Sequence, residues 1–276
     1  MSVSPKLAAA LHISIKPEGL EIAADIFYMK LHAVKYSGGE VTDKLAAIGQ
    51  SLLEQRIYSG LQDHIDYKWA KIAEVCLASS KAVKSAERIC SKFLLALSNG
   101  APGYHYGQFL HSLFKVQPEV ALTNILAAAP TSMIRRQLTE DLYTCPHPLA
   151  PVPLNVLVAW ASREPEERFD VLAETIPLFE GGDDEGHEAL SPLAIALLEA
   201  APDKEAILGH YGQRLHPSSW SGSLADILEK RRKAVLVLAN HPDQKIANWT
   251  ISQAEKMAVW AESDRARKRN VDMSFE

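Results

Sequence analysis

Residues 109–125 read FLHSLFKVQPEVALTNI: an apolar segment meets proline and an acidic residue, and a second apolar segment follows. Proline cannot continue a helix that has already begun. It does suit the first turn of the next helix, where its missing N–H is not needed. The acid after it lies at the positive end of the new helix dipole. This stretch therefore predicts a helix, a tight corner and an antiparallel second helix.

The same corner recurs along the chain. The four instances are Gln117-Pro118-Glu119, Glu164-Pro165-Glu166, Ala201-Pro202-Asp203 and His241-Pro242-Asp243, with prolines 47, 37 and 40 residues apart. Five positions before the prolines stand the apolar residues Leu113, Trp160, Leu197 and Val237. Such a period is typical of two-helix HEAT-type repeats, whose apolar stripes are buried only when neighbours stack. X-Pro corners also arise in helical proteins without repeats, but the apolar residues at equivalent positions before each proline favour the repeat.

The remaining apolar residues also follow helical spacing. Stripes at i, i+3, i+4 and i+7 run through residues 20–34, 45–53, 69–77 and 89–97. Alternation with period two is nearly absent, so no strand is expected. The predicted fold class is all-α, arranged as an α-solenoid of HEAT-like antiparallel helix pairs, roughly six in number.

A proline-rich connector from Cys145 to Pro153 is the best candidate for a hinge between two lobes. We therefore expect an N-terminal helical lobe over residues 1–145 and HEAT-like repeats over residues 146–264. A charged tail is expected over residues 265–276, which include Arg265, Arg267, Lys268 and Arg269.

The composition narrows the class of protein. The 276 residues are 47% hydrophobic and carry a formal net charge of −5, which gives no global attraction to nucleic acid or anionic lipid. The three cysteines form neither a disulfide framework nor a zinc pattern. No signal peptide is evident and no apolar run approaches the ~18 residues of a membrane span. We expect a soluble, cytoplasmic protein without membrane association.

Several pieces of the chain resemble the HEAT-like C-terminal region of large bacterial proteins. They are residues 109–118, 157–160, 191–194, 215–223 and 272–276, and the resemblance extends over roughly residues 15–276. Such proteins often carry a P-loop NTPase module upstream, and some are thought to act in antiviral defence. The resemblance implies a sensor or scaffold module. Because the chain has no G-x-x-x-x-G-K-[ST] motif, no NTPase chemistry is implied.

Three clusters could carry chemistry, and none has the required spacing. His105 and His111 are six residues apart, a poor fit to one helix face for a metal pair. The acidic segment 183–188 with His187 does not follow the EF-hand pattern. Cys145 and His147, on either side of a proline, rarely meet productively as a nucleophile and base. We expect no enzyme, no cofactor and no metal; an enzyme built on these loops is the least favoured alternative.

The expected function is a non-catalytic protein–protein interaction scaffold or sensor, with bacterial defence as the context that the resemblance suggests. Candidate partner-binding residues are Tyr104, Tyr106, Trp220, Arg231, Arg232 and Lys233. Trp220 lies in a Ser/Gly-rich segment where packing on a neighbouring repeat is favoured and an exposed anchor is the alternative. Ser223 and Asp226 resemble a capping box at the helix that follows.

The alternative function is nucleic-acid binding through the basic C-terminal helices, because helical repeats can hold phosphates with such residues. Acidic neighbours weaken this alternative: Glu229, Glu255, Glu262 and Asp264 are interspersed with the basic residues.

Overall fold

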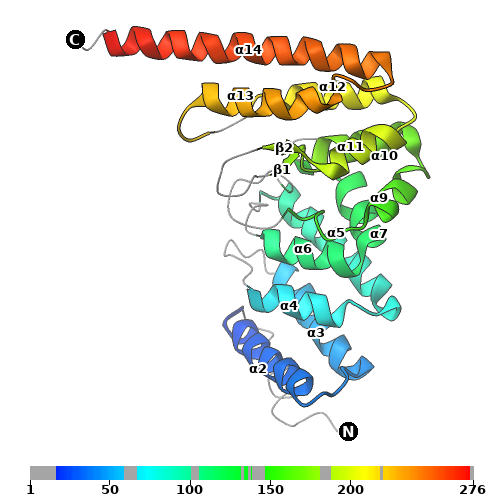
Figure 1. Cartoon of the computed structure of the whole chain (residues 1–276). Coiled ribbons are helices and arrows are strands. Elements are labelled where there is room, and N and C mark those ends of the chain that lie inside the picture. Colours follow the sequence, from blue (N-terminus) through cyan, green and yellow to red (C-terminus); the bar gives the residue numbers. More distant parts are fainter. Residues whose placement is uncertain are drawn as a thin grey trace. The chain divides into compact units, whose positions relative to one another are not determined.

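The computed structural model describes residues 17–58, 67–100, 106–131, 134–135, 138, 147–180, 188–217 and 220–273 (Figure 1). Most of these residues lie in helices, which confirms the all-α class. They form two compact units, Met1–Trp160 and Ala161–Glu276. The expected boundary was residue 145, and the boundary in the structure lies within the helix that follows the proline-rich connector.

The described residues of the first unit lie mostly in helices. They are α2 (Pro17–Tyr36), α3 (Asp43–Tyr58), α4 (Tyr67–Cys76), η1 (Ser80–Ala82), α5 (Val83–Ser98), α6 (Gly107–Val116), α7 (Pro118–Ala121), the π-helical turn η3 (Leu122–Ala127) and nearly all of α9 (Leu154–Ala161). Helices two positions apart in the sequence are neighbours: α2 contacts α4, α4 contacts α6, α3 contacts α5, and α5 contacts α7. The apolar stripes predicted from the sequence supply this core, for example Phe27, Trp69, Ile72 and Phe93.

Gly49 marks the tightest point of this core. It is buried in α3, and a Cβ atom at this position would collide with Cys76 Sγ and lie 2.9 Å from Cζ of Phe27. Glycine costs a helix stability relative to alanine, so its presence here is explained by the close approach of α2 and α4.

Two glutamine side chains, one from α3 and one from the corner before α7, satisfy carbonyl groups at the end of α4. The Nε2–H of Gln50 donates to the carbonyl oxygen of Cys76 at 2.8 Å, and that of Gln117 donates to Leu77 at 2.6 Å and Ser79 at 3.1 Å. The last carbonyls of a helix have no partner within the helix, so these bonds both cap α4 and attach it to its neighbours. Gln117 is the first residue of the first predicted corner.

The four proline corners divide into two types. Pro118 and Pro165 occupy the first turn of α7 and of α10 (Pro165–Thr175), as predicted. Pro202 and Pro242 instead lie two residues before their helices. There the following aspartates are the caps: Asp203 Oδ1 accepts the Ala206 N–H at 3.0 Å and Asp243 Oδ1 accepts the Lys245 N–H at 2.9 Å. Aspartate is a preferred N-cap and glutamate is not, which explains why the helices after Pro202 and Pro242 start later.

The second unit contains α10, β1 (Phe179–Glu180), β2 (Ala189–Leu190), α11 (Pro192–Ala200), α12 (Lys204–Arg214), α13 (Leu224–Val235), η4 (Leu236–Leu238) and α14 (Gln244–Met273). Helix α14 packs along α13, and α12 contacts both α10 and α14 (Figure 1). The antiparallel ladder pairs Phe179 with Leu190 and Glu180 with Ala189. Strands of two residues carry no periodicity, so the sequence did not indicate them. Residues 265–273, expected to belong to a tail, continue α14.

Asp264 joins the two longest helices of this unit. Its side chain is buried, its Oδ2 accepts the Ala225 N–H at the start of α13 at 3.3 Å, and its Oδ1 lies 2.7 Å from Arg267 Nη2. The hydrogen bond from Arg267, supported by Lys268 and by the backbone of Ala225, lowers the pKa of the Asp264 carboxyl. The ionised form is therefore favoured in the folded state, and it also complements the dipole of α13.

The stability that Asp264 contributes should depend on pH. Because the folded pKa is lowered, the contribution is complete above the ordinary aspartate value of about 4 and is lost as pH falls through the folded value. We expect Asp264→Asn to reduce the urea midpoint at pH 7 and the difference from wild type to shrink below about pH 4. Glu255→Gln, at an exposed position of α14, controls for the loss of a carboxylate. A difference that stays constant down to pH 2 would contradict this role.

Candidate partner-binding surface

The second unit carries an exposed cluster of three aromatic rings, here called the aromatic patch: His216, Trp220 and Trp260. The His216 ring lies 5.9 Å from that of Trp220 and 5.7 Å from that of Trp260, with interplanar angles of 84° and 78°. Trp220 is 45% exposed and Trp260 is 37% exposed. Edge-to-face contacts of this kind hold the three rings in one arrangement while leaving part of each tryptophan open to solvent.

The chain between α12 and α13 presents His216 outwards because both of its neighbours are buried. Leu215 and Pro217 point into the protein, and His216 is exposed between them. The Nδ1–H of His216 donates to the carbonyl oxygen of Pro217 at 2.9 Å, which fixes the ring. The segment ends at Ser223, whose Oγ accepts the Asp226 N–H at 3.3 Å, so the predicted N-cap is confirmed.

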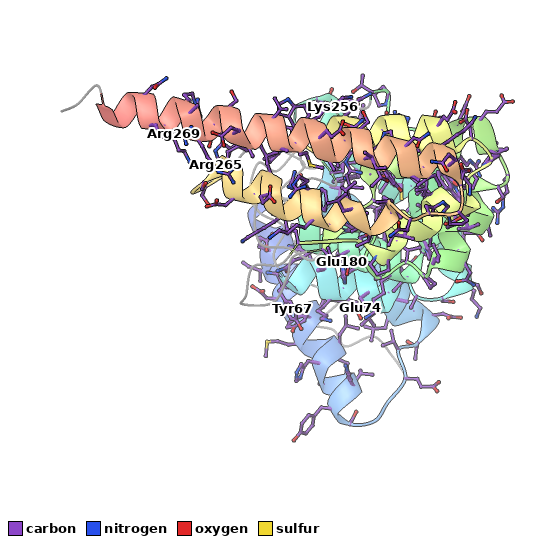
Figure 2. The ribbon with its side chains drawn as sticks, turned by 45° about the horizontal axis from the view of Figure 1, so that its top comes forward. Tyr67, Glu74, Glu180, Lys256, Arg265 and Arg269 are labelled. Carbon is purple, nitrogen blue, oxygen red and sulfur yellow. The ribbon has the colours of Figure 1, made fainter. Side chains whose placement is uncertain are left out.

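The cations of α14 divide into paired and open ones. Figure 2 shows Lys256, Arg265 and Arg269 spaced along this helix. The carboxylate of Glu262 forms ion pairs with both arginines, at 3.6 Å with Arg265 and at 2.8 Å with Arg269. Lys256 is exposed and stands four residues before Trp260, on the same side of the helix. A positive charge therefore lies next to the aromatic patch.

The predicted basic set at 231–233 does not form one surface. Arg231 is turned inward: its Nε lies 2.9 Å from Glu188 Oε2 and its Nη1–H donates to the carbonyl oxygen of Leu215 at 3.0 Å. Its guanidinium also lies 4.8 Å from the centroid of the Phe179 ring. Arg232 pairs with Glu229 on its own helix at 2.6 Å, and Lys233 is exposed. Arg231 thus attaches α13 to the β ladder and to the end of α12.

Of the two tyrosines predicted to form a contact surface, only Tyr106 lies among the described residues, and it is buried. Tyr106 is 2% exposed and packs edge-on against Phe93 with ring centroids 5.0 Å apart, and burial raises the pKa of its hydroxyl. It belongs to the core because Phe93 and the start of α6 enclose it, so it does not face a partner. Tyr104, His105, Cys145 and residues 183–187 lie outside the described residues. His111 contacts the carbonyl oxygen of His147 through Nδ1 at 3.4 Å.

The first unit has a hollow of about 810 Å³ between α2 and α4. Tyr28, Tyr36 and Tyr67 line it together with Lys35 and Lys71. Glu74, labelled with Tyr67 in Figure 2, lies at 2.6 Å from both Lys71 and Lys115, and these lysines lower the pKa of its carboxyl. This hollow could not be predicted from the sequence, because residues of two separate helices line it. The lining presents aromatic rings and charged side chains to a ligand.

No group of three or more histidine, cysteine or acidic side chains is placed to hold a metal ion among the residues that the structure describes. No described helix combines the length and the apolar character needed to cross a bilayer. Comparisons with protein-family models, with curated proteins and with solved structures find no match to this chain.

Proposed function

We propose that this chain is a non-catalytic protein-interaction module, built as an α-solenoid of HEAT-like helix pairs, that holds a partner protein on the aromatic patch. The observation that carries the proposal is the pair of part-exposed tryptophans, Trp220 and Trp260, on either side of His216. Tryptophan is the residue most enriched in binding hot spots, where it supplies a large rigid surface at low entropic cost.

Long-range hydrogen bonds support the repeat architecture. The Gln117 bond to Leu77 spans 40 residues, the Arg214 bond to Ala173 spans 41, and the His241 contact with Glu199 spans 42. These separations match the spacing of the proline corners. In a stack of helix pairs each residue meets its equivalent neighbour one repeat away, so a recurring separation of one period is expected. The contacts between alternate helices within each unit support the same arrangement.

The chemistry of the patch favours an acidic partner segment that carries an apolar or aromatic side chain. The rings of Trp220 and Trp260 provide the apolar contact, and Lys256 provides a positive charge beside it. Nucleic acid fits less well, because Glu262 and Asp264 already pair with the cations at the end of α14. The cellular context we attach to this module is the bacterial defence setting suggested by the sequence resemblance.

The double variant Trp220→Ala/Trp260→Ala tests the proposal. The purified full chain and the variant are immobilised and exposed to extract of the source organism, and retained proteins are quantified by mass spectrometry. We expect at least one protein to be retained by the wild type and reduced about 30-fold by the variant, since removing a hot spot costs ~2 kcal/mol or more. The control is Tyr67→Ala, which removes an aromatic side chain 56% exposed in the other unit.

The same experiment separates the two classes of partner. Equal retention by wild type and double variant, or no specific protein at all, would overturn the proposed function. Retention that disappears when the extract is treated with nuclease would assign the surface to nucleic acid instead. Lys256→Glu should weaken a protein partner selectively at low salt, because an exposed charge acts mainly through screened attraction.

A further inference from the structure

The hollow between α2 and α4 has the size of a small-molecule site. Its volume of about 810 Å³ falls within the range of roughly 300–1,000 Å³ that is usual for ligand pockets. Residues of α2, of the turn after it and of α4 line the hollow, so its walls belong to one compact unit. The turn contributes Gly38 and Gly39, which carry no side chains, so only backbone lines this edge.

Three tyrosines give the hollow an aromatic lining. Tyr28 and Tyr36 come from α2, and Tyr67 begins α4. Tyr36 is 89% exposed and Tyr67 is 56% exposed, so most of each ring is open to solvent. Aromatic side chains that present their faces in this way stack on planar rings, which is how many proteins hold single nucleic-acid bases. The lining therefore favours a ligand that contains a planar ring.

The charged side chains of the hollow leave an excess of positive charge. Among the described residues that line it, Lys35 and Lys71 are cationic and Glu74 carries the one carboxylate. Glu74 lies 2.6 Å from Lys71 and 2.6 Å from Lys115, so two lysines share this carboxylate. The Lys35 ammonium is exposed and forms no ion pair within the described ranges. A phosphate monoester, with a charge of about −2 at neutral pH, complements such a surface.

Lys71 connects the aromatic and the charged parts of the lining. Its Nζ lies 5.4 Å from the centroid of the Tyr67 ring. The hydrogen bond to Glu74 is the main cause of a raised pKa at Lys71, and Tyr67 and Tyr28 both lie near enough to add to it. An ammonium group has three N–H donors, and the bond to Glu74 uses one of them. A phosphate bound to Lys71 would therefore hold its attached ring next to the tyrosines.

We propose that the hollow between α2 and α4 binds a nucleoside monophosphate. Lys35 and Lys71 attract the phosphate as point charges, and the base stacks on the tyrosine rings. A nucleoside without phosphate would leave both lysines without an anion, and free phosphate would leave the rings unused. The site lies in the other unit from the aromatic patch, so this inference does not depend on the proposed function.

Isothermal titration calorimetry of the full chain tests the class of ligand. The probes are AMP, GMP, CMP and UMP, followed by the corresponding nucleosides and by inorganic phosphate. We expect at least one mononucleotide to bind one-to-one with a dissociation constant below about 1 mM. Its nucleoside and inorganic phosphate should each bind at least about 10-fold more weakly, because each makes only part of the contacts. Failure of all four mononucleotides to bind, or equal binding by phosphate or nucleoside alone, would overturn the proposal.

Substitutions locate the site on the protein. Lys35→Ala and Lys71→Ala should each weaken the bound mononucleotide about 10-fold, since each removes a charge-assisted contact. Tyr36→Ala should also weaken it, while Tyr36→Phe, which keeps the ring, should bind like wild type. Tyr36 is 89% exposed, so its loss should leave the far-UV circular dichroism unchanged. The control is Lys30→Ala, which removes an exposed lysine of α2 outside the lining. Equal losses for Lys30→Ala and Lys35→Ala would show a general charge effect and contradict the site.

Discussion

Replacing Gly49 by leucine is expected to unfold the first unit. A side chain at this position points at Cys76 of α4 and at the Phe27 ring of α2, and its first carbon alone would already overlap them. Both neighbours are buried and belong to the helices that define the unit, so neither can move without opening the core. Close-packed interiors tolerate added volume poorly. The cost should reach the whole stability of a small domain, about 5 kcal/mol.

The smaller change Gly49→Ala separates the two opposing effects. Alanine improves the helix by about 1 kcal/mol, while the overlap costs about 1–3 kcal/mol, so we expect a net destabilisation. The second substitution Cys76→Ala removes the sulfur from the site and should recover part of the loss. The Phe27 ring at 2.9 Å remains, so the recovery should be incomplete.

Urea unfolding followed by far-UV circular dichroism measures these variants. The matched control is Gly209→Ala, because Gly209 is also helical and its added carbon would meet nothing within 4 Å. That variant should gain up to about 1 kcal/mol from helix propensity. A Gly49→Ala protein that is as stable as Gly209→Ala would show that α2, α3 and α4 do not approach this closely.

Replacing Arg231 by alanine is expected to have the largest effect in the second unit. The guanidinium pairs with Glu188, donates to the carbonyl oxygen of Leu215 and lies over the Phe179 ring. The side chain is 17% exposed, so its removal leaves part-buried acceptors without their partner. Hydrogen bonds to charged groups and cation–π contacts together suggest a loss of about 2–4 kcal/mol.

Two further substitutions provide a comparison for the loss of stability expected of Arg231→Ala. Arg232→Ala removes an arginine that pairs with Glu229 one turn away, so its cost should stay near 0.5 kcal/mol, about that of an exposed helical ion pair. Arg231→Lys keeps the charge but loses the planar fork and the ring contact, and it should recover only part of the stability. Hydrogen–deuterium exchange on peptides from residues 188–217 should increase for Arg231→Ala. Equal effects of Arg231→Ala and Arg232→Ala would contradict the internal role.

The helices could be predicted because burial repeats along them with a period that the sequence displays. The spacing predicts one buried face, and all of its residues are buried: Trp69, Ile72, Ala73, Cys76 and Leu77. Val237 was matched with core residues at the other corners, yet it is 65% exposed. The reason is local: it lies in the 3-10 turn η4, where the rotation per residue differs from that of an α-helix.

The exposure and partners of surface residues could not be predicted where two segments far apart in the sequence determine them. Packing on a neighbouring repeat was the favoured prediction for Trp220, yet the side chain is 45% exposed, which agrees with the alternative of an exposed anchor. Its neighbour Trp260 lies in a helix 40 residues later, and nothing in the chain connects the two before folding. Arg231 looked like part of a basic surface because its acidic partner, Glu188, is 43 residues away. The burial of Tyr106 could not be predicted, because the ring it packs against, Phe93, belongs to the preceding helix.

Because Cys76 and Cys90 are buried, the reactivity of their thiols measures how often the core of the first unit opens. Loss of hydration raises the pKa of both thiols to about 12, so at neutral pH only about one in 10⁵ is the reactive thiolate. An alkylating reagent can reach either sulfur only while the surrounding helices are apart. The rate of alkylation at these two native cysteines therefore reports the frequency with which the core opens, and no cysteine has to be introduced.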